Sequence, residues 1–163
     1  MACCGEAQWS LSDLTGSDGP ATGELLARVH ASDLSILARG GRRRDLAFSE
    51  TVIDDCAHLL PNFNDRLEAV RESLLAALIS RPDSPGLIHR DFSADQVLIG
   101  SGCPCLIDSD RSATSDRDSD IGSFLARLDE EVLDGTTAPD AAARAGDTLQ
   151  HARRLRQRGR LKG

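Results

Sequence analysis

The stretch that decides the fold is Leu87–Asp110, LIHRDFSADQVLIGSGCPCLIDSD. Two apolar residues lead into a polar loop that runs from His89 to Gln96, and a strand-like run, Val97–Ile99, follows it. A Gly-Ser-Gly turn then leads to a second apolar run, which ends just before Asp108. Short apolar runs on either side of a glycine-containing turn predict an antiparallel hairpin.

The open end of this hairpin is a candidate cation site. A turn centred on Gly102 would place Gln96 opposite Asp108 on the two strands. Facing side chains on one face of a sheet lie within about 5 Å of each other, so both oxygens could bind one cation. Amide and carboxylate oxygens suit Mg²⁺ better than Zn²⁺. Asp91, in the preceding loop, is left free to act as a base or to orient a hydroxyl.

The aspartates of this stretch also have an ordinary interpretation. Asp91, Asp95, Asp108 and Asp110 could each be a helix cap or a turn residue, because aspartate is common in both places. The functional interpretation therefore rests on their order along the chain. His-x-Asp comes first, a glutamine follows five residues after the aspartate, and then come strand, turn, strand and aspartate.

This ordered set resembles the catalytic loop of protein-kinase-like phosphotransferases, H-x-D-x-x-x-x-N. Phe92 and the Asp-Gln-Val-Leu-Ile run are more similar to the aminoglycoside phosphotransferase and choline kinase branch than to protein kinases. Residues Ile107–Asp110 resemble the metal-binding I-D-x-D of that branch, and Ser115–Gly122 resemble its G-D-P-x-x-D-L-G segment. In this chain Gln96 replaces the family's asparagine, and Arg90 replaces the glycine usual in this branch.

The resemblance implies a role for each matched residue. Asp91 would receive or orient the acceptor hydroxyl, while Gln96 and Asp108 would hold Mg²⁺ on the phosphates of ATP. His89 would brace the loop, and Asp120 would hydrogen-bond it from the start of the next helix. The implied activity is transfer of the ATP γ-phosphate to a hydroxyl of a small molecule, aminoglycoside-like or similar.

The resemblance also implies the fold, which would be α+β and mostly α. It is that of a protein-kinase-like C-terminal lobe, with helices around a small β-hairpin that carries the catalytic and metal-binding loops. No glycine-rich strand pair and no lysine precede residue 87, and the sole lysine is Lys162. Because the nucleotide lobe of such enzymes supplies both, we expect this N-terminal lobe to be absent. The chain would then be truncated, and weakly active or inactive without a missing lobe.

Apolar residues at helical spacing predict the helices that surround the hairpin. They fall at about 22–32, 51–60, 64–80, from 118 or 119 to 132, and from about 139. The helix at 64–80 is the clearest amphipathic one. His30 is interpreted as a packing or surface histidine, and Arg42–Arg44 as part of a solvated loop. Asp110 and Asp116 would lie near the acceptor or support the catalytic loop.

Composition and charge limit the class of protein. One phosphotransferase-lobe domain is expected at 22–150, between a poorly ordered lead-in at 1–21 and a basic tail at 151–163. The net charge of −7 does not favour a nucleic-acid partner. No apolar run approaches the length of about 18 residues that a membrane span needs, and the start lacks a signal-peptide pattern. We therefore expect no membrane segment and a cytoplasmic protein with reduced thiols.

Two other functions are compatible with these residues. The lobe could be a non-catalytic binding or regulatory remnant of the fold, which would not bind Mg²⁺-ATP. A metal-dependent hydrolase built on His89, Asp91 and Asp108 would act without nucleotide, although such enzymes usually need more histidine ligands. The acceptor stays open among an aminoglycoside, another antibiotic, a sugar and an amino alcohol, because a fold does not determine its substrate.

Overall fold

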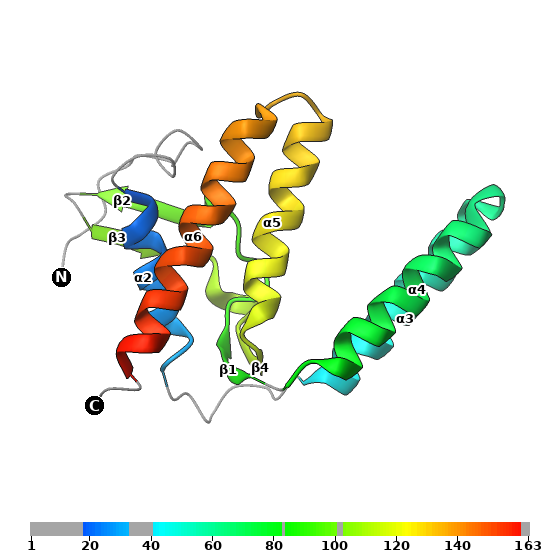
Figure 1. Cartoon of the computed structure of the whole chain (residues 1–163), viewed down its shortest axis with the longest axis horizontal. Helices are drawn as coiled ribbons and strands as arrows, with labels where there is room; N and C mark the ends of the chain where they lie inside the picture. Colours follow the sequence, from blue (N-terminus) through cyan, green and yellow to red (C-terminus); the bar gives the residue numbers. More distant parts are fainter. Residues whose placement is uncertain (1–17, 33–40, 83, 101–102, 161–163) are drawn as a thin grey trace.

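The computed structural model describes residues 18–32, 41–82, 84–100 and 103–160 (Figure 1). Its α-helices are α2 (Asp18–Val29), α3 (Arg42–Leu59), α4 (Asn64–Ser80), α5 (Asp118–Leu133) and α6 (Pro139–Arg160). Its strands are β1 (Pro85–Ile88), β2 (Val97–Gly100), β3 (Cys103–Leu106) and β4 (Ala113–Asp116). Three short 3-10 helices complete the described part: η1 (Pro61–Phe63), η2 (Ala94–Gln96) and η3 (Ser109–Arg111).

The strands form two small antiparallel sheets among these residues. β1 pairs with β4, and β2 pairs with β3. The fold is therefore α+β and mostly helical, as the sequence predicted, with the β2–β3 hairpin where it was expected. The β1–β4 pair was not expected, because Ala113–Asp116 lies in a stretch that reads as a polar loop. No helix within the described ranges combines the length and the apolar character needed to cross a membrane.

The hydrophobic core lies where α2, α5 and α6 meet the loop between β1 and β2. Helix α2 packs along α6, and α6 packs on α5 (Figure 1). The largest buried side chains are Phe92 of the loop and Phe124 of α5, whose ring centroids lie 5.6 Å apart. Leu26 of α2 and Leu149 of α6 are also fully buried in this cluster. The loop is thus packed into the core rather than laid over it.

The predicted helices are present, with differences in extent. Helix α2 runs from Asp18 to Val29 rather than over 22–32. Helix α4 spans the residues expected, but α3 begins at Arg42 rather than near residue 51. The prediction of a solvated loop for Arg42–Arg44 is therefore wrong: Gly41, with a φ of 128°, makes the turn, and arginine is a good helix former. Helix α6 continues to Arg160, across the boundary expected at 150. Residues 1–17 of the expected lead-in lie outside the described residues.

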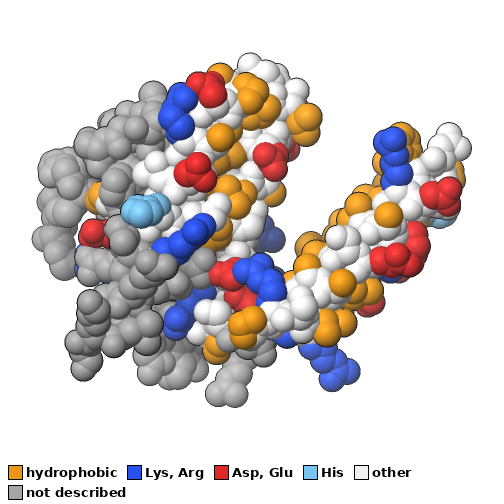
Figure 2. Space-filling model, in the orientation of Figure 1, with side chains coloured by type: hydrophobic (Ala, Val, Ile, Leu, Met, Phe, Trp, Pro, Cys, Tyr) orange, Lys and Arg blue, Asp and Glu red, His pale blue; other side chains and the backbone are white. Residues whose placement is uncertain are grey.

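Helices α3 and α4, joined by η1, form a two-helix arm that projects from the core (Figure 1). Ile53 is buried in α3, whereas α4 has no buried residue. The cause is geometric, because each helix of an isolated pair is covered on one side only. Hydrophobic side chains are consequently exposed along the length of the arm (Figure 2).

Candidate active site

The loop from His89 to Gln96 is fixed to the core by its aromatic residue. Phe92 is 1% exposed, and its ring packs against Phe124 of α5. The ring of Phe92 also meets that of His89 edge-on, with centroids 6.3 Å apart. Because truncation of a buried phenylalanine costs about 3–5 kcal/mol, this packing holds the middle of the loop in one place.

A buried carboxylate at the start of α5 holds the backbone of the same loop. Asp120 is fully buried and accepts hydrogen bonds from the backbone N–H groups of His89 and Arg90, both at 2.9 Å. Its Oδ2 atom also lies 2.8 Å from Nε2 of His30, a buried residue just after α2. A buried charge is costly unless hydrogen bonds satisfy it, and these contacts do so. The end of α2, the loop and α5 therefore meet at one side chain.

The backbone at Arg90 adopts a conformation that few residues accept. Its φ is 72°, in the left-handed region, which is uncommon for residues other than glycine. Such a conformation costs on the order of 1–3 kcal/mol, and the hydrogen bond from Arg90 to Asp120 offsets part of it. The next residue, Asp91, then reaches the surface with its side chain 39% exposed. The carboxylate of Asp91 is therefore accessible, whereas the backbone just before it is held by Asp120.

His89 connects the loop to the residue that follows β3. Its side chain is fully buried, and Nε2 lies 2.9 Å from the carbonyl oxygen of Ile107. Because a carbonyl oxygen only accepts, Nε2 carries the proton in this contact. The N–H of Ile107 in turn donates to the carbonyl of Gln96 at 3.0 Å. These two contacts place Asp108, the next residue, beside the end of the loop.

The register of the hairpin differs from the predicted one by a single residue. Strands β2 and β3 pair so that Gln96 faces Ile107, not Asp108. The prediction centred the turn on Gly102 and left three residues in the connection, whereas the observed pairing leaves two, the commonest length for a hairpin. A slip of one residue moves a side chain to the other face. The cross-strand argument for joining Gln96 and Asp108 is therefore wrong.

Backbone conformation sets the position of Asp108 instead. Its φ of 57° and ψ of 48° are left-handed, which aspartate tolerates better than most residues, and its side chain is exposed. The Oε1 atom of Gln96 is buried and has no hydrogen-bond partner among the described residues. A buried oxygen without a partner costs free energy, and a cation would satisfy it.

The chemistry of these two donors fits Mg²⁺. Mg²⁺ is commonly bound through one or two protein oxygens, with water and phosphate oxygens completing its six ligands. Gln96 and Asp108 supply an amide oxygen and a carboxylate of this kind. Nowhere in the described ranges, this site included, do three His, Cys, Asp or Glu side chains gather into a cluster.

Arg111 is a residue of this site that the sequence did not single out. Its Nη1 atom lies 3.2 Å from Oδ2 of Asp91, and the two side chains are 66% and 39% exposed. Arg111 ends η3, the short turn just after Asp108. Its place directly after an Asp-x-Asp was the only signal available, because the contact spans 20 residues of sequence. Exposed ion pairs are weak, so this contact between Arg111 and Asp91 contributes little to stability.

A second arginine acts on the loop from α5. The carboxylate of Glu130 accepts a hydrogen bond from Arg127 and raises the pKa of its guanidinium above the usual value. The negative charges of Asp95 and Asp91 raise this pKa further, by smaller amounts. The loop carboxylates therefore contribute a small part of the electrostatic environment of Arg127.

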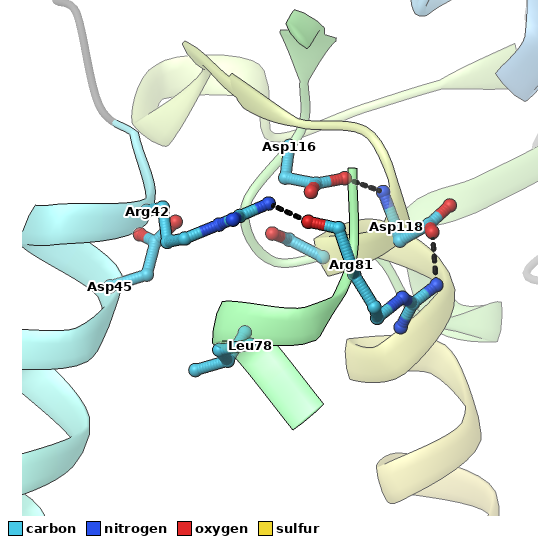
Figure 3. A pocket seen from close by; sticks show the side chains of 7 residues that line it. Arg42, Asp45, Leu78, Arg81, Asp116 and Asp118 are labelled. Atoms are coloured by element: carbon cyan, nitrogen blue, oxygen red, sulfur yellow. Dashed lines mark hydrogen bonds and ion pairs between the residues drawn. The ribbon is translucent and has the colours of Figure 1, made fainter. Parts of the chain in front are cut away.

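The remaining acidic residues of the resemblance lie apart from this loop. Asp110 is exposed in η3, whereas Asp116 ends β4 and accepts a hydrogen bond from the N–H of Asp118 at 2.9 Å. Asp116 lines a cavity of about 130 Å³ at the root of the arm (Figure 3). There Arg42 donates to the carbonyl of Arg81, whose guanidinium pairs with Asp118. Asp116 thus belongs to the joint between the arm and the core.

Comparison with known families matches residues 5–159 to the family described as "Phosphotransferase enzyme family". The matched range includes the loop, the hairpin, the arm and most of α6. Comparison with curated proteins finds no match.

Several solved structures resemble the fold, among them the following three. A choline/ethanolamine kinase family protein from Mesorhizobium loti is 18% identical with a TM-score of 0.63, over 90% of this chain and 47% of that one. An aminoglycoside-3'-phosphotransferase of type VIII is 21% identical with a TM-score of 0.54, over 91% of this chain and 66% of that one. The gentamicin complex of APH(2")-IIa is 16% identical with a TM-score of 0.57, over 94% of this chain and 57% of that one. The chain thus spans less than two thirds of the length of each.

Proposed function

Because the chain belongs to the phosphotransferase enzyme family, we propose that it forms the catalytic half of a kinase that transfers the γ-phosphate of ATP to a hydroxyl of a small molecule. The observation that carries this proposal is the loop held by Asp120, which presents Asp91 beside the turn that contains Asp108. Phosphoryl transfer needs positioning and charge neutralisation more than covalent chemistry from the protein. A loop fixed through its backbone and its buried phenylalanine supplies such positioning.

In this proposal Gln96 and Asp108 hold Mg²⁺. The bound ion would supply positive charge against the phosphate oxygens of ATP. The buried and unpartnered Oε1 of Gln96 supports this assignment, as does the exposed carboxylate of Asp108. His89 bonds to the carbonyl of Ile107, whose N–H donates to the carbonyl of Gln96, so the backbone next to both residues is held.

Asp91 acts on the acceptor. Its carboxylate would accept a hydrogen bond from the attacking hydroxyl, orient the oxygen toward the phosphorus, and take the proton as the new P–O bond forms. For this, Arg111 must give up its contact with Asp91, which their exposure allows. Arg111 would then be free to neutralise charge on the transferred phosphoryl group.

The remaining half of the nucleotide site would come from further polypeptide. The chain spans 47% of the Mesorhizobium loti protein, and its sole lysine is Lys162. We propose that a lobe with a glycine-rich strand pair and a lysine completes the ATP site, and that this chain alone binds Mg²⁺-ATP weakly. ATP-dependent transfer also fits the cytoplasmic setting expected from the sequence.

The acceptor is proposed as an aminoglycoside or an amino alcohol. The support is the names of the similar structures, which include a gentamicin complex and a choline/ethanolamine kinase family protein. A panel of both classes, assayed with Mg²⁺-ATP and the completing lobe of a relative, would separate them. Phosphorylation of neither class would contradict this choice of acceptor but not the transfer chemistry.

Calorimetric titration of the chain with ATP, with and without Mg²⁺, tests the metal site. We expect Asp108→Ala to abolish Mg²⁺-dependent binding, because the variant removes the only carboxylate assigned to the ion. Asp91→Ala should keep the binding and remove transfer. Asp134→Ala, at the exposed end of α5, is the matched control and should behave as wild type. Equal nucleotide affinity in wild type and in Asp108→Ala would contradict the metal assignment.

A second candidate is a non-catalytic binding or regulatory remnant of the fold. Absence of any Mg²⁺-ATP binding or shift in melting temperature would support it over a kinase. The metal-dependent hydrolase is less well supported, because the His89 ring is fully buried and its Nε2 is bonded to a backbone carbonyl.

A further inference from the structure

The arm exposes an apolar stripe on α3. Phe48, Val52 and Leu59 are 69%, 42% and 74% exposed. At about 100° of rotation per residue, these three side chains lie within about 40° of one another around the helix. Ile53, the buried residue of α3, points to a different side, at least about 100° away. Phe48 and Val52 lie one turn apart, and Leu59 lies about two turns further along the same side. Single exposed apolar residues are ordinary, but three on one side of a helix form a surface that another molecule can cover.

Charged residues flank this stripe in a self-complementary order. Arg44 comes one turn before Phe48, and Asp55 comes about one turn after Val52. Eleven residues make about three turns, so Arg44 and Asp55 lie on the same flank of the stripe, within about 20° of each other. Both side chains are exposed. A basic residue at one end and an acidic residue at the other can pair with the same sequence running in the opposite direction.

We propose that the stripe binds a second copy of this chain, with the two α3 helices antiparallel. In such a two-fold contact, if one residue of the first copy meets a second residue of the other copy, the same pair also meets with the copies exchanged. Arg44 of each copy would face Asp55 of the other, and Phe48 would face Val52. The two arms would form a four-helix bundle. The bundle would cover apolar faces that a lone helix pair leaves exposed. This inference does not depend on the proposed activity.

Sedimentation analysis over a wide concentration range tests the interface. We expect a monomer–dimer equilibrium, and we expect Phe48→Asp to weaken dimerisation by at least about tenfold, because both copies lose a central aromatic residue. Leu133→Asp, at an 87% exposed site on α5, is the control and should dimerise as wild type. Circular dichroism would show whether Phe48→Asp still folds; if it does not, Val52→Asn takes its place.

Charge reversal tests the antiparallel register. Arg44→Glu and Asp55→Arg should each weaken the dimer, because each places like charges opposite one another twice. The double variant should restore dimerisation, since the pairs re-form with reversed polarity. A chain that stays monomeric at every concentration, or a dimer that Phe48→Asp leaves unchanged, would overturn the proposal. Failure of the double variant to recover would overturn the antiparallel arrangement.

Discussion

Phe92 and Phe48 are residues of the same type, but one lies in the core and the other on the arm. Phe92 is 1% exposed in the core, and Phe48 is 69% exposed on the arm. In the core α2, α5 and α6 surround the loop, so each apolar face has a partner, whereas α3 and α4 pack mainly on each other. An amphipathic pattern therefore predicts a helix without predicting how deeply the helix is buried. Burial depends on how many other elements the fold brings to that face.

Truncation of these two residues should give the largest contrast. Phe92→Ala should lower the free energy of unfolding by about 3–5 kcal/mol, because it leaves a cavity beneath the loop. Phe48→Ala should lower it by less than about 1 kcal/mol in the monomer, because the side chain buries little area. Chemical denaturation of both variants at low protein concentration makes the comparison. Similar losses would mean that the arm is covered in solution.

The polar centre of the core should respond next. Asp120→Asn should cost about 2–3 kcal/mol, because the amide nitrogen cannot accept from the loop N–H groups or from His30 and leaves buried donors unsatisfied. Hydrogen exchange should show earlier opening at His89 and Arg90. Asp134→Asn, at the exposed residue that follows α5, serves as the reference. Unchanged exchange at the two loop amides would contradict the anchoring role.

Two glycines should respond in opposite directions to the same change. A Cβ at Gly86 would lie 2.7 Å from the carbonyl oxygen of His30 and 2.1 Å from Nε of Arg117, so Gly86→Ala should destabilise the fold by about 1–3 kcal/mol. A Cβ at Gly122 meets nothing within 4 Å. Gly122→Ala should instead stabilise α5 by about 0.5–1 kcal/mol through helix propensity. Melting temperatures that move in the same direction would refute the packing argument.

The smallest effect on stability is expected at the surface of the site. Arg111→Gln should change the free energy of unfolding by less than about 0.5 kcal/mol, because exposed ion pairs contribute little. In a kinase completed by a nucleotide lobe, the same variant should lower kcat more than KM if Arg111 neutralises the transferred group. A large loss of stability would show instead that Arg111 has a structural role.

Local patterns in the sequence identified most of the helices. Helix α4 matches its prediction because apolar spacing along a single segment determines it. The hairpin was found by the same kind of signal, but its register was misplaced by one residue, because the sequence did not distinguish a two-residue from a three-residue connection. The charge of Arg42–Arg44 suggested a solvated loop, although the helix propensity of arginine is high and these residues begin α3.

Long-range contacts were the part that the sequence could not supply. β4 has few apolar residues. It is a strand because it pairs with β1, which lies well before it in the sequence. His30 was interpreted as a packing or surface histidine; it is buried, but the sequence did not show that its partner is Asp120, 90 residues away. The contact between Arg111 and Asp91 was missed for the same reason. The residue types of the candidate site were visible in the sequence, but the contacts that position them were not.

The left-handed backbone at Arg90 has a consequence for how the site could be assembled. The groups that hold it there, Asp120, His30 and the packed ring of Phe92, all belong to this chain. The shape of the loop from His89 to Gln96 is therefore set by contacts within the described part of this chain. A nucleotide lobe supplied as a separate polypeptide would have to contribute affinity for ATP. It would not have to impose the conformation of the loop.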